Sequence, residues 1–288
     1  MTIDVLEPHG FCAGVRNALR KALALVAPSA PGASGASAPR AAQTPVYCLH
    51  ELVHNELVVD DLRRRGFVFV ESVEEVPEGA TVLFSAHGVG PAVRAAAAAR
   101  RLKVVDATCP FVTRVHAAAK AFAAKGLPVV ILGHPGHAEV KGIMGEVPDP
   151  IVVDTYPHPA LVPGNAAAAP RLGVASQTTL NADEVHDAVA RLRKDFALET
   201  MAEVCHATKE RQDAVKAFDG DALLVLGSAN SSNTKRLCEV ARCRTFRAGT
   251  LEEVRQLDFG GVRRLGVTSG ASTPEDFFGA VVRELEER

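Results

Sequence analysis

The sequence contains no tryptophan and only two tyrosines, and aromatic residues make up 5% of its 288 residues. Proteins that bind single-stranded nucleic acid stack bases on aromatic side chains, so the sequence disfavours this class. It also lacks a strong charge of either sign, since 32 Lys and Arg stand against 34 Asp and Glu. No overall field therefore attracts nucleic acid or an anionic membrane surface. An acidic ligand must be bound by a local site.

Long apolar runs are absent as well, because Arg, Lys, Gly or Pro interrupts the alanine-rich stretches every few positions. A membrane-spanning helix needs about 20 consecutive apolar residues, so none is expected. The first residues, MTIDVLEPHGFCAGVR, do not combine a basic stretch with an apolar one, which argues against a secretory signal peptide. Six cysteines are too few and too scattered for a disulfide scaffold. We expect a cytoplasmic protein with no membrane or nucleic-acid partner.

Short apolar or β-branched runs alternate with helical patterns along the chain, and 47% of the residues are hydrophobic, enough for a substantial core. Such alternation is typical of α/β folds with mainly parallel sheets. The predicted strands are Ile3–Leu6, Val46–Leu49, Val68–Val70, Thr81–Ser85, Lys103–Val105, Val129–Leu132, Ile151–Val153, Leu172–Ala175, Leu223–Leu226 and Leu265–Thr268. Residues 28–45 are rich in Pro, Gly, Ser and Ala and predict a mobile surface loop, with a linker as the alternative.

Length alone favours about two domains, but the cysteine spacing indicates three repeated units, with chance spacing as the alternative. Cys12, Cys109 and Cys205 are 97 and 96 residues apart, and each directly precedes a predicted helix. Two polar residues follow each cysteine at comparable distances, and these are His54 and His87, His137 and Thr178, and Asn233 and Ser272. We expect three similar α/β lobes, formed by residues 13–108, residues 109–203, and residues 1–12 together with 204–288.

The three units would bring the three cysteines together. Parallel α/β units bind ligands where strand ends meet helix N-termini, so a pseudo-threefold arrangement directs these side chains into one central cavity. A helix N-terminus lowers the pKa of a thiol, but three converging thiolates repel one another unless a metal centre neutralises them. No fourth cysteine ligand is evident, so an open zinc site and a 4Fe-4S cluster with one non-cysteine iron both fit. Three further cysteines are interpreted as core residues, namely Cys48, Cys238 and Cys243.

The polar residues near these cysteines are suited to an anion. His54, His87 and His137 follow predicted strands, and the loops GSANSSN and SGASTP add Ser231, Ser232, Asn233 and Ser272. Small loops at helix N-termini bind phosphate groups, although each loop alone could simply cap a helix. Glu139 lies two residues beyond His137, where burial beside an anion would raise its pKa and favour a proton-donating form. An ordinary solvated loop carboxylate is the alternative.

Eight segments resemble the 4-hydroxy-3-methylbut-2-enyl diphosphate reductase family, the iron-sulfur enzymes that end the methylerythritol phosphate route of isoprenoid biosynthesis. These segments are GFCAGVRNAL, HELVHNELVVDDLRRRG, VPEGATVLFSAHGV, VVDATCPFVTRVH, ILGHPGHAEVKGIMG, SQTTL, GSANSSNTKRL and TSGASTP. They follow the family's order from Gly10 to Pro274, and together they are far more specific than any single motif.

The resemblance implies a three-lobed fold around a 4Fe-4S cluster bound by Cys12, Cys109 and Cys205. It implies a diphosphate site formed by His54, His87, His137, Ser231, Ser232, Asn233 and Ser272. Glu139 and Thr178 would handle the proton and the substrate hydroxyl. The implied reaction is a two-electron, two-proton reductive dehydroxylation of 4-hydroxy-3-methylbut-2-enyl diphosphate. It yields isopentenyl and dimethylallyl diphosphates, with a ferredoxin or flavodoxin as electron donor.

The sequence departs from the family around the third cysteine. The family pattern CYAT-x-NRQ reads CHATKERQ here, with His206 in place of Tyr, Lys209 at the variable position and Glu210 in place of Asn. Residues around cluster ligands tune the cluster, so this segment bears on turnover. The insert at 28–45 and the chain end at Arg288 are also unusual for the family. Two alternatives follow: a non-catalytic isoprenoid-diphosphate-binding paralogue, and a zinc-dependent hydrolase that uses the same three cysteines.

Overall fold

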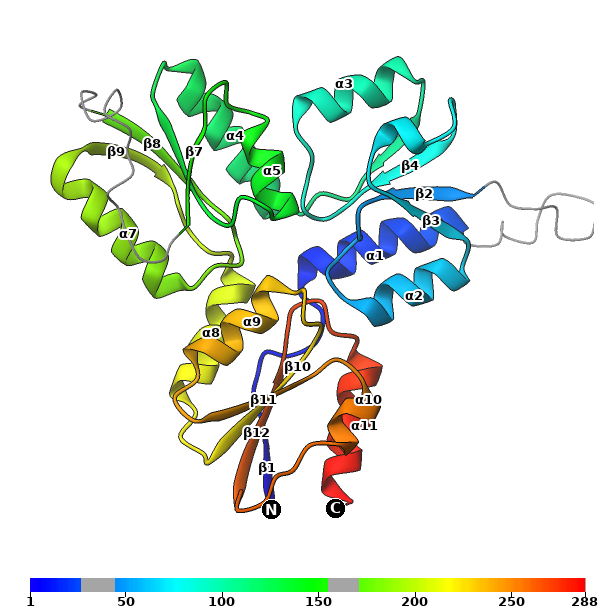
Figure 1. Ribbon diagram of the computed structural model, residues 1–288, viewed down its shortest axis with the longest axis vertical. Coiled ribbons are helices and arrows are strands. Elements are labelled where there is room, and N and C mark those ends of the chain that lie inside the picture. The colour runs from blue at the N-terminus through cyan, green and yellow to red at the C-terminus, as the bar shows by residue number, and fades with distance from the viewer. Residues whose placement is uncertain (27–44, 155–170, 288) are drawn as a thin grey trace, which may run out of the picture.

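The computed structural model describes residues 1–26, 45–154 and 171–287, so most of the predicted 28–45 loop lies outside the described residues. The described chain folds into three four-stranded sheets, each with helices packed on it, and these form three lobes that meet at the centre of the molecule (Figure 1). Every described strand pair is parallel. The predicted α/β fold with small parallel sheets is confirmed.

Each sheet is built from strands with their own helices. The first sheet has the order β3-β2-β4-β5, and its elements are α1 (Ala13–Val26), β2 (Val46–Leu49), α2 (Glu56–Arg64), β3 (Phe67–Val70), the 3-10 turn η1 (Val73–Glu75), β4 (Thr81–Phe84), α3 (Pro91–Ala99) and β5 (Lys103–Asp106). The second has the order β7-β6-β8-β9, with α4 (Pro110–Ala124), β6 (Val129–Leu132), α5 (Ala138–Met144), β7 (Ile151–Val153), β8 (Arg171–Ser176), α7 (Ala182–Asp195) and β9 (Ala197–Met201). The third has the order β1-β12-β10-β11, with β1 (Thr2–Val5), α8 (His206–Ala217), β10 (Ala222–Leu226), α9 (Ser232–Val240), β11 (Arg244–Ala248), α10 (Leu251–Arg255), β12 (Arg264–Ser269) and α11 (Glu275–Glu286).

The central strands are those that the sequence predicts most clearly. β6 reads VVIL and β10 reads ALLVL, and every residue of both is buried, as expected for parallel strands covered on both faces. Two strands were missed, β9 (ALETM) and β11 (RTFRA). Both lie at a sheet edge, and polar residues interrupt both, Glu199 and Thr200 in β9 and Arg244, Thr245 and Arg247 in β11, so neither forms a continuous apolar run.

The N-terminal strand belongs to the third sheet, because β1 pairs with β12 from Thr2↔Arg264 to Val5↔Val267. Separate apolar cores fill the three lobes. Ala18 and Ala22 of α1 pack on the first sheet around Cys48, whereas residues of α11 pack on the third. This division supports the lobes that we propose, residues 13–108, 109–203, and 1–12 with 204–288.

The remaining cysteines lie in these cores, as predicted. Cys48 is fully buried in β2, and burial raises the pKa of its thiol to about 12. Cys238 and Cys243 are partly buried against the core of the third lobe, and burial raises the pKa of Cys238 to about 11. None of the six forms a disulfide within the described residues. No helix there is long and apolar enough to cross a membrane.

The first and second lobes contact each other through glycines. A Cβ atom on Gly88 would lie 3.0 Å from Nε2 of His116, and one on Gly142 would lie 3.0 Å from Cε1 of the same ring. Gly88 also has a φ of +75°, which disfavours other residues. Nδ1 of the buried His116 lies 3.0 Å from Oε1 of Glu146. Close packing here fixes the loop after β4 against α5, and both carry predicted site residues.

Candidate functional site

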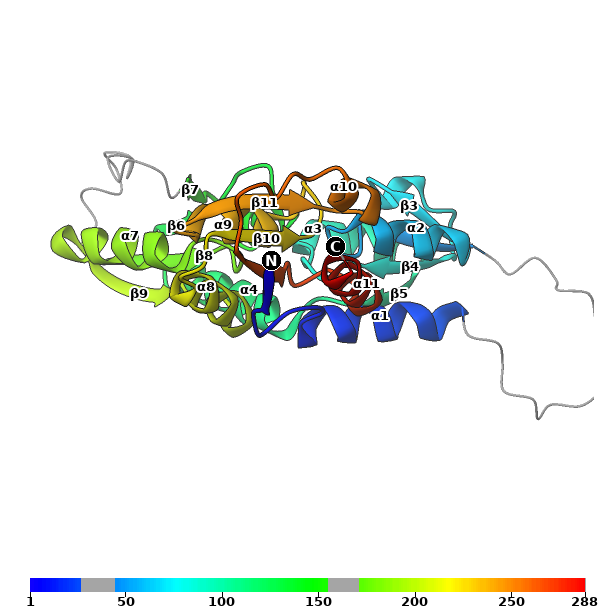
Figure 2. The same ribbon diagram turned by 90° about the horizontal axis from the view of Figure 1, so that it is seen from below.

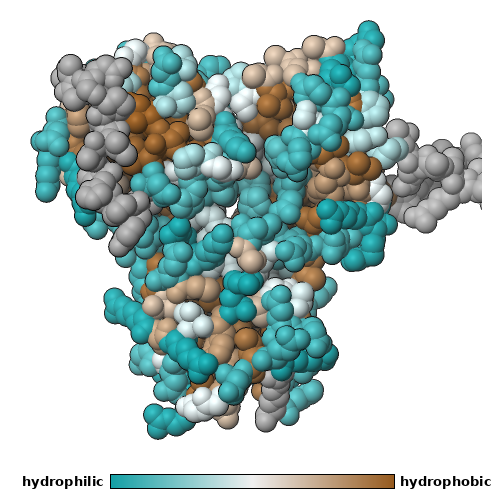
Figure 3. Space-filling view, viewed as in Figure 1, coloured by the Kyte–Doolittle hydropathy of each residue, from teal (hydrophilic) through white to brown (hydrophobic). Residues whose placement is uncertain are grey.

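All twelve predicted site residues line one cavity of about 110 Å³ where the three lobes meet. They are Cys12, His54, His87, Cys109, His137, Glu139, Thr178, Cys205, Ser231, Ser232, Asn233 and Ser272. Hydrophilic residues gather around this junction on the face shown in Figure 3. No lysine or arginine is among the described residues that line the cavity, so neutral donors and histidines must meet any anion.

The three cysteines occupy equivalent positions. Cys12, Cys109 and Cys205 directly precede or cap α1, α4 and α8, which lie toward the same side of the molecule in Figure 2. Pro110 opens α4, where a helix needs no amide donor. The backbone N–H of Val15 lies 3.4 Å from Sγ of Cys12. Each cysteine is thus held at a helix N-terminus by the local chain.

The predicted low thiol pKa is wrong for Cys109 and Cys205. Burial raises the pKa of Cys109 and of Cys205, and this outweighs the backbone hydrogen bonds at the helix ends, which lower it. Nearby Cys12 and Glu139 raise both pKa values further. Ionising all three thiols in this cavity therefore requires a cation, since the helix ends alone do not compensate for lost hydration.

Gly14 lies between two of the cysteines. A Cβ atom there would be 2.7 Å from Sγ of Cys109 and 3.7 Å from Sγ of Cys12, so only glycine fits without movement. Yet within residues 1–26, 45–154 and 171–287 no three His, Cys, Asp or Glu side chains are close enough to hold one metal ion. A single zinc needs all its sulfur ligands at about 2.3 Å. Three thiols spread around a cavity suit a multinuclear iron-sulfur cluster, in which each cysteine binds a different iron.

Three histidines form one wall of the cavity. The ring centroids of His54 and His87 are 4.3 Å apart, and that of His137 lies 5.2 Å from the former and 5.6 Å from the latter. Burial, with repulsion from neighbouring histidines, holds the pKa of His87 well below its ordinary value and lowers that of His137 to about 3. An anion in the cavity would oppose both effects and favour protonation of these rings.

Hydrogen bonds fix the orientations of these rings. Nδ1 of His54 lies 3.0 Å from Oε2 of Glu51. Nδ1 of His137 accepts the backbone N–H of Glu139 at 3.2 Å, so the neutral ring carries its proton on Nε2. The rings are therefore held in place before any ligand binds, which favours binding.

The third lobe supplies a further part of the cavity lining. Ser231 caps α9, accepting the backbone N–H of Thr234 at 3.3 Å, so the capping role considered for this loop applies to Ser231. Asn233 is 4% exposed, and both polar atoms of its side chain are buried without a hydrogen-bond partner in the described structure. Unpaired buried polar atoms cost roughly 1–3 kcal/mol each, so the Asn233 amide has both a donor and an acceptor free to bind a ligand. Ser272 Oγ donates to the backbone oxygen of His54 at 3.0 Å.

Glu139 and Thr178 form a buried pair. Oε1 of Glu139 accepts the backbone N–H of Thr178 at 2.7 Å, and Oε2 accepts its hydroxyl at 3.0 Å. Burial raises the pKa of Glu139 to about 7, outweighing these hydrogen bonds, which lower it. The raised pKa confirms the prediction from sequence. The carbonyl of Thr178 also accepts the backbone N–H of Cys205 at 3.0 Å, which links the carboxyl group to the third cysteine.

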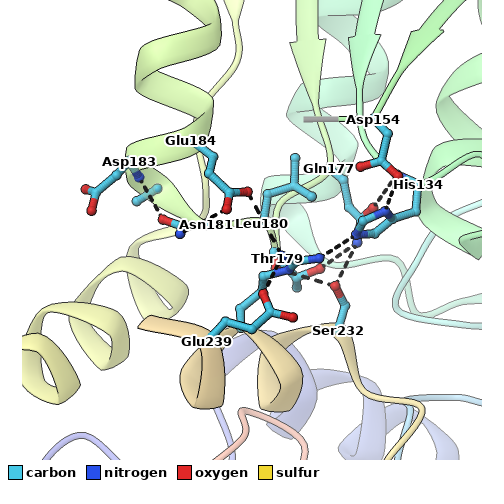
Figure 4. Close-up of polar contacts among 12 residues, drawn as sticks. His134, Asp154, Gln177, Thr179, Leu180, Asn181, Asp183, Glu184, Ser232 and Glu239 are labelled. Carbon is cyan, nitrogen blue, oxygen red and sulfur yellow. Dashed lines mark hydrogen bonds and ion pairs between the residues drawn. The ribbon is translucent and has the colours of Figure 1, made fainter. Parts of the chain in front are cut away.

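Sequence reasoning missed a polar network that joins the second and third lobes (Figure 4). Nε2 of Gln177, just after β8, donates to Oγ of Ser232 at 3.1 Å, and its Oε1 accepts the backbone N–H of His134 at 3.2 Å. Nε2 of His134 lies 2.9 Å from Arg236 of α9, and its Nδ1 lies 3.1 Å from Asp154. Gln177 and His134 lie within the motifs SQTTL and GHPGH, which were the available signal.

The unusual CHATKERQ segment does not alter the cavity. Nδ1 of His206 lies 3.2 Å from Oε2 of Glu210, and Lys209 pairs with Asp213, all on the exposed face of α8. None of His206, Lys209 and Glu210 lines the cavity. The retained Thr208 is buried, and its hydroxyl lies 3.1 Å from Sγ of Cys205. The departure from the family pattern is therefore confined to surface ion pairs.

Comparisons with known proteins identify the family of this chain. The family model described as LytB protein matches residues 3–286. A 4-hydroxy-3-methylbut-2-enyl diphosphate reductase of Acidithiobacillus ferrooxidans is 41% identical over 299 residues, covering 99% of this chain and 89% of the relative. One of Mycolicibacterium gilvum is 44% identical over 295 residues, covering 98% and 83%.

Two solved structures are also similar. The E-1-hydroxy-2-methyl-but-2-enyl-4-diphosphate reductase of Plasmodium falciparum superposes with a TM-score of 0.83 at 28% identity, covering 99% of this chain and 87% of that one. A structure described as (E)-4-hydroxy-3-methyl-but-2-enyl diphosphate reductase, the terminal enzyme of the non-mevalonate pathway, has a TM-score of 0.68 at 30% identity, with full coverage of both chains. This chain belongs to the LytB protein family.

Proposed function

We propose that this chain is a 4-hydroxy-3-methylbut-2-enyl diphosphate reductase, an oxidoreductase of isoprenoid biosynthesis by the methylerythritol phosphate pathway. The reaction takes up two electrons and two protons, breaks the carbon-oxygen bond of the substrate hydroxyl and releases water. It leaves isopentenyl or dimethylallyl diphosphate. The observation that carries the proposal is one cavity that combines three cysteines, a buried Glu139–Thr178 pair and a wall of neutral donors.

Cys12, Cys109 and Cys205 would hold a 4Fe-4S cluster. Their spread around the cavity and the small Gly14 beside two of them support a cluster over a single ion. When bound, such a cluster supplies electrons and a Lewis-acidic iron that lacks a cysteine ligand. The zinc-hydrolase alternative loses support, because the described residues place no three ligands around one point.

The substrate diphosphate would bind between the histidine wall and α9. Ser231, Ser232 and Ser272 offer hydroxyls, and Asn233 offers an amide with no other partner in the described structure. The rings of His87 and His137 are half-buried and meet edge to face, so a nearby diphosphate would favour their protonated forms. Charge-assisted hydrogen bonds would then form only when the ligand is present.

Glu139 would supply the proton for the departing hydroxyl. With a pKa of about 7, its carboxyl group carries a proton in much of the protein at neutral pH. The Thr178 hydroxyl, now 3.0 Å from Oε2 of Glu139, would turn toward the substrate hydroxyl and relay or orient that proton. Burial keeps bulk water from this pair, since Glu139 is 1% exposed.

The protein would work in the cytoplasm, with a small ferredoxin or flavodoxin as its electron donor. Protein purified without oxygen should be brown and contain about four iron and four sulfide per chain, as a cluster of this type requires. Cys12→Ser should lower this content, whereas Cys243→Ser, outside the cavity, should not. A colourless protein after anaerobic reconstitution would overturn the proposed centre. If the cluster-loaded protein binds the substrate tightly but does not reduce it, the non-catalytic paralogue is favoured.

A further inference from the structure

Arg211 joins the segments that carry two of the cysteines. It lies on α8, and its Nη1 donates to the carbonyl of Ala207 at 2.9 Å. Its Nη2 donates to the carbonyl of Gly10, far away in sequence, at 2.8 Å. Ala207 lies two residues after Cys205, and Gly10 lies two residues before Cys12. One guanidinium group thus connects the two ligand segments directly.

This guanidinium is buried without a carboxylate. Arg211 is 2% exposed, and its Nε is buried with no hydrogen-bond partner in the described structure. It forms no ion pair with Asp or Glu among residues 1–26, 45–154 and 171–287. The adjacent Glu210 points to His206, with Oε2 3.2 Å from Nδ1. A buried charge needs an opposite charge nearby, and carbonyl dipoles supply only part of it.

We expect the cysteines, as thiolates, to supply the negative charge that balances the Arg211 guanidinium. Burial lowers the pKa of Arg211, whereas the charges of Cys12 and Cys205 raise it. A cluster bound by thiolates becomes more negative when it takes up an electron. A fixed positive charge nearby stabilises that reduced form and raises the reduction potential. Hydrogen bonds and charges around cluster ligands are known to set this potential.

We propose that Arg211 is a positioning residue that holds the Cys12 and Cys205 segments together and whose charge makes the cluster easier to reduce. This inference rests on the proposed iron-sulfur function. It differs from a purely structural role, because it predicts a change in potential that an uncharged bridge would not produce.

The test measures the midpoint potential of the anaerobically purified protein by a redox titration followed by electron paramagnetic resonance. Arg211→Gln removes the charge but keeps a donor, Arg211→Lys keeps the charge, and Lys209→Gln removes an exposed charge from the same helix. We expect the potential to be more negative in R211Q, nearer to wild type in R211K, and unchanged in K209Q. Iron and sulfide content are measured on the same samples.

The outcomes separate the possibilities. A loaded R211Q with the wild-type potential would overturn the proposal. If R211Q does not retain a cluster, a loaded R211K near the wild-type potential supports it. If both variants lose the cluster while their cluster-free forms melt as wild type does, the bridging role is supported. If both variants also lose the fold of the cluster-free chain, Arg211 is merely structural and the proposal is wrong. Wild-type protein without iron would instead refute the proposed function.

Discussion

Gly14 lies so close to Cys109 that a Cβ atom would be 2.7 Å from its sulfur. At this contact α1 meets the second lobe, where the side chains of Cys12 and Cys109 line the same cavity. Any larger residue would have to push Cys109 or α1 aside. The glycine therefore determines how closely two of the proposed ligands approach.

Gly14→Ala should lose most of its iron, because the added methyl group displaces a cysteine sulfur. Overpacking of this kind costs about 1–3 kcal/mol, so the cluster-free chain should still fold. Gly279→Ala in α11 is the matched control, since a Cβ there meets only the flexible end of Arg283, at 3.4 Å. Iron analysis and thermal unfolding distinguish the two. Full iron content in G14A would show that the close contact does not shape the site.

Glu139→Gln should keep the cluster and bind substrate, but turn over about 10²–10⁴-fold more slowly, because the amide cannot donate the proton of a carboxylic acid. Steady-state kinetics with separate kcat and KM values measure this. Glu203→Gln, which changes an exposed carboxylate near Cys205, serves as control. A near wild-type kcat in E139Q would remove Glu139 from the mechanism.

The same carboxyl group should make stability depend on pH. The pKa of Glu139 rises from 4.5 to about 7 on folding, so the folded chain binds more protons than the unfolded chain between these values. Its contribution to stability is present below pH 4.5 and is lost as pH rises through 7. The loss is on the order of 3 kcal/mol, at about 1.4 kcal/mol per pKa unit.

The measurement is the free energy of unfolding of the cluster-free chain from pH 5 to pH 8, for wild type and E139Q. The difference between the two cancels the opposite contribution of His87 and His137, whose pKa values are lowered. Wild type should lose stability relative to E139Q as pH rises. A difference that is independent of pH would contradict the raised pKa.

Asn233→Ala should raise the KM for the diphosphate roughly 10-fold or more, because hydrogen bonds to a charged group contribute about 1.5–3 kcal/mol. It should not destabilise the ligand-free chain, where the amide has no partner in the described structure. Asn181→Ala is the converse control. Asn181 caps α7 by accepting the backbone N–H of Asp183, so its loss costs about 1 kcal/mol of stability with KM unchanged. Equal KM values for both variants would remove Asn233 from the binding site.

The sequence predicts the site better than its electrostatics. Cys12, Cys109 and Cys205 converge because residues at the ends of parallel strands meet at one place, a rule that needs no coordinates. The predicted direction of the thiol pKa shift was wrong for Cys109 and Cys205, because it depends on how deeply these two sulfurs are buried, and their burial follows from the packing of three lobes. The direction of the Glu139 pKa shift was predicted correctly because burial raises this pKa more than the two hydrogen bonds from Thr178 lower it.

The missed features share one cause. Gln177, His134 and Arg236 are ordinary polar residues whose role appears only when the second lobe is placed beside the third (Figure 4). The edge strands β9 and β11 likewise depend on a neighbouring strand, because their own sequences are half polar. Contacts between segments far apart in the chain leave little trace in local patterns.

The most direct test is an anaerobic assay with reduced methyl viologen and 4-hydroxy-3-methylbut-2-enyl diphosphate. We expect the protein to oxidise the viologen only when the substrate is present, taking two electrons for each hydroxyl lost. The summed amount of isopentenyl and dimethylallyl diphosphates should equal the amount of substrate consumed. Substrate that remains intact in the presence of cluster-loaded protein and excess reductant would contradict the assignment as a reductase.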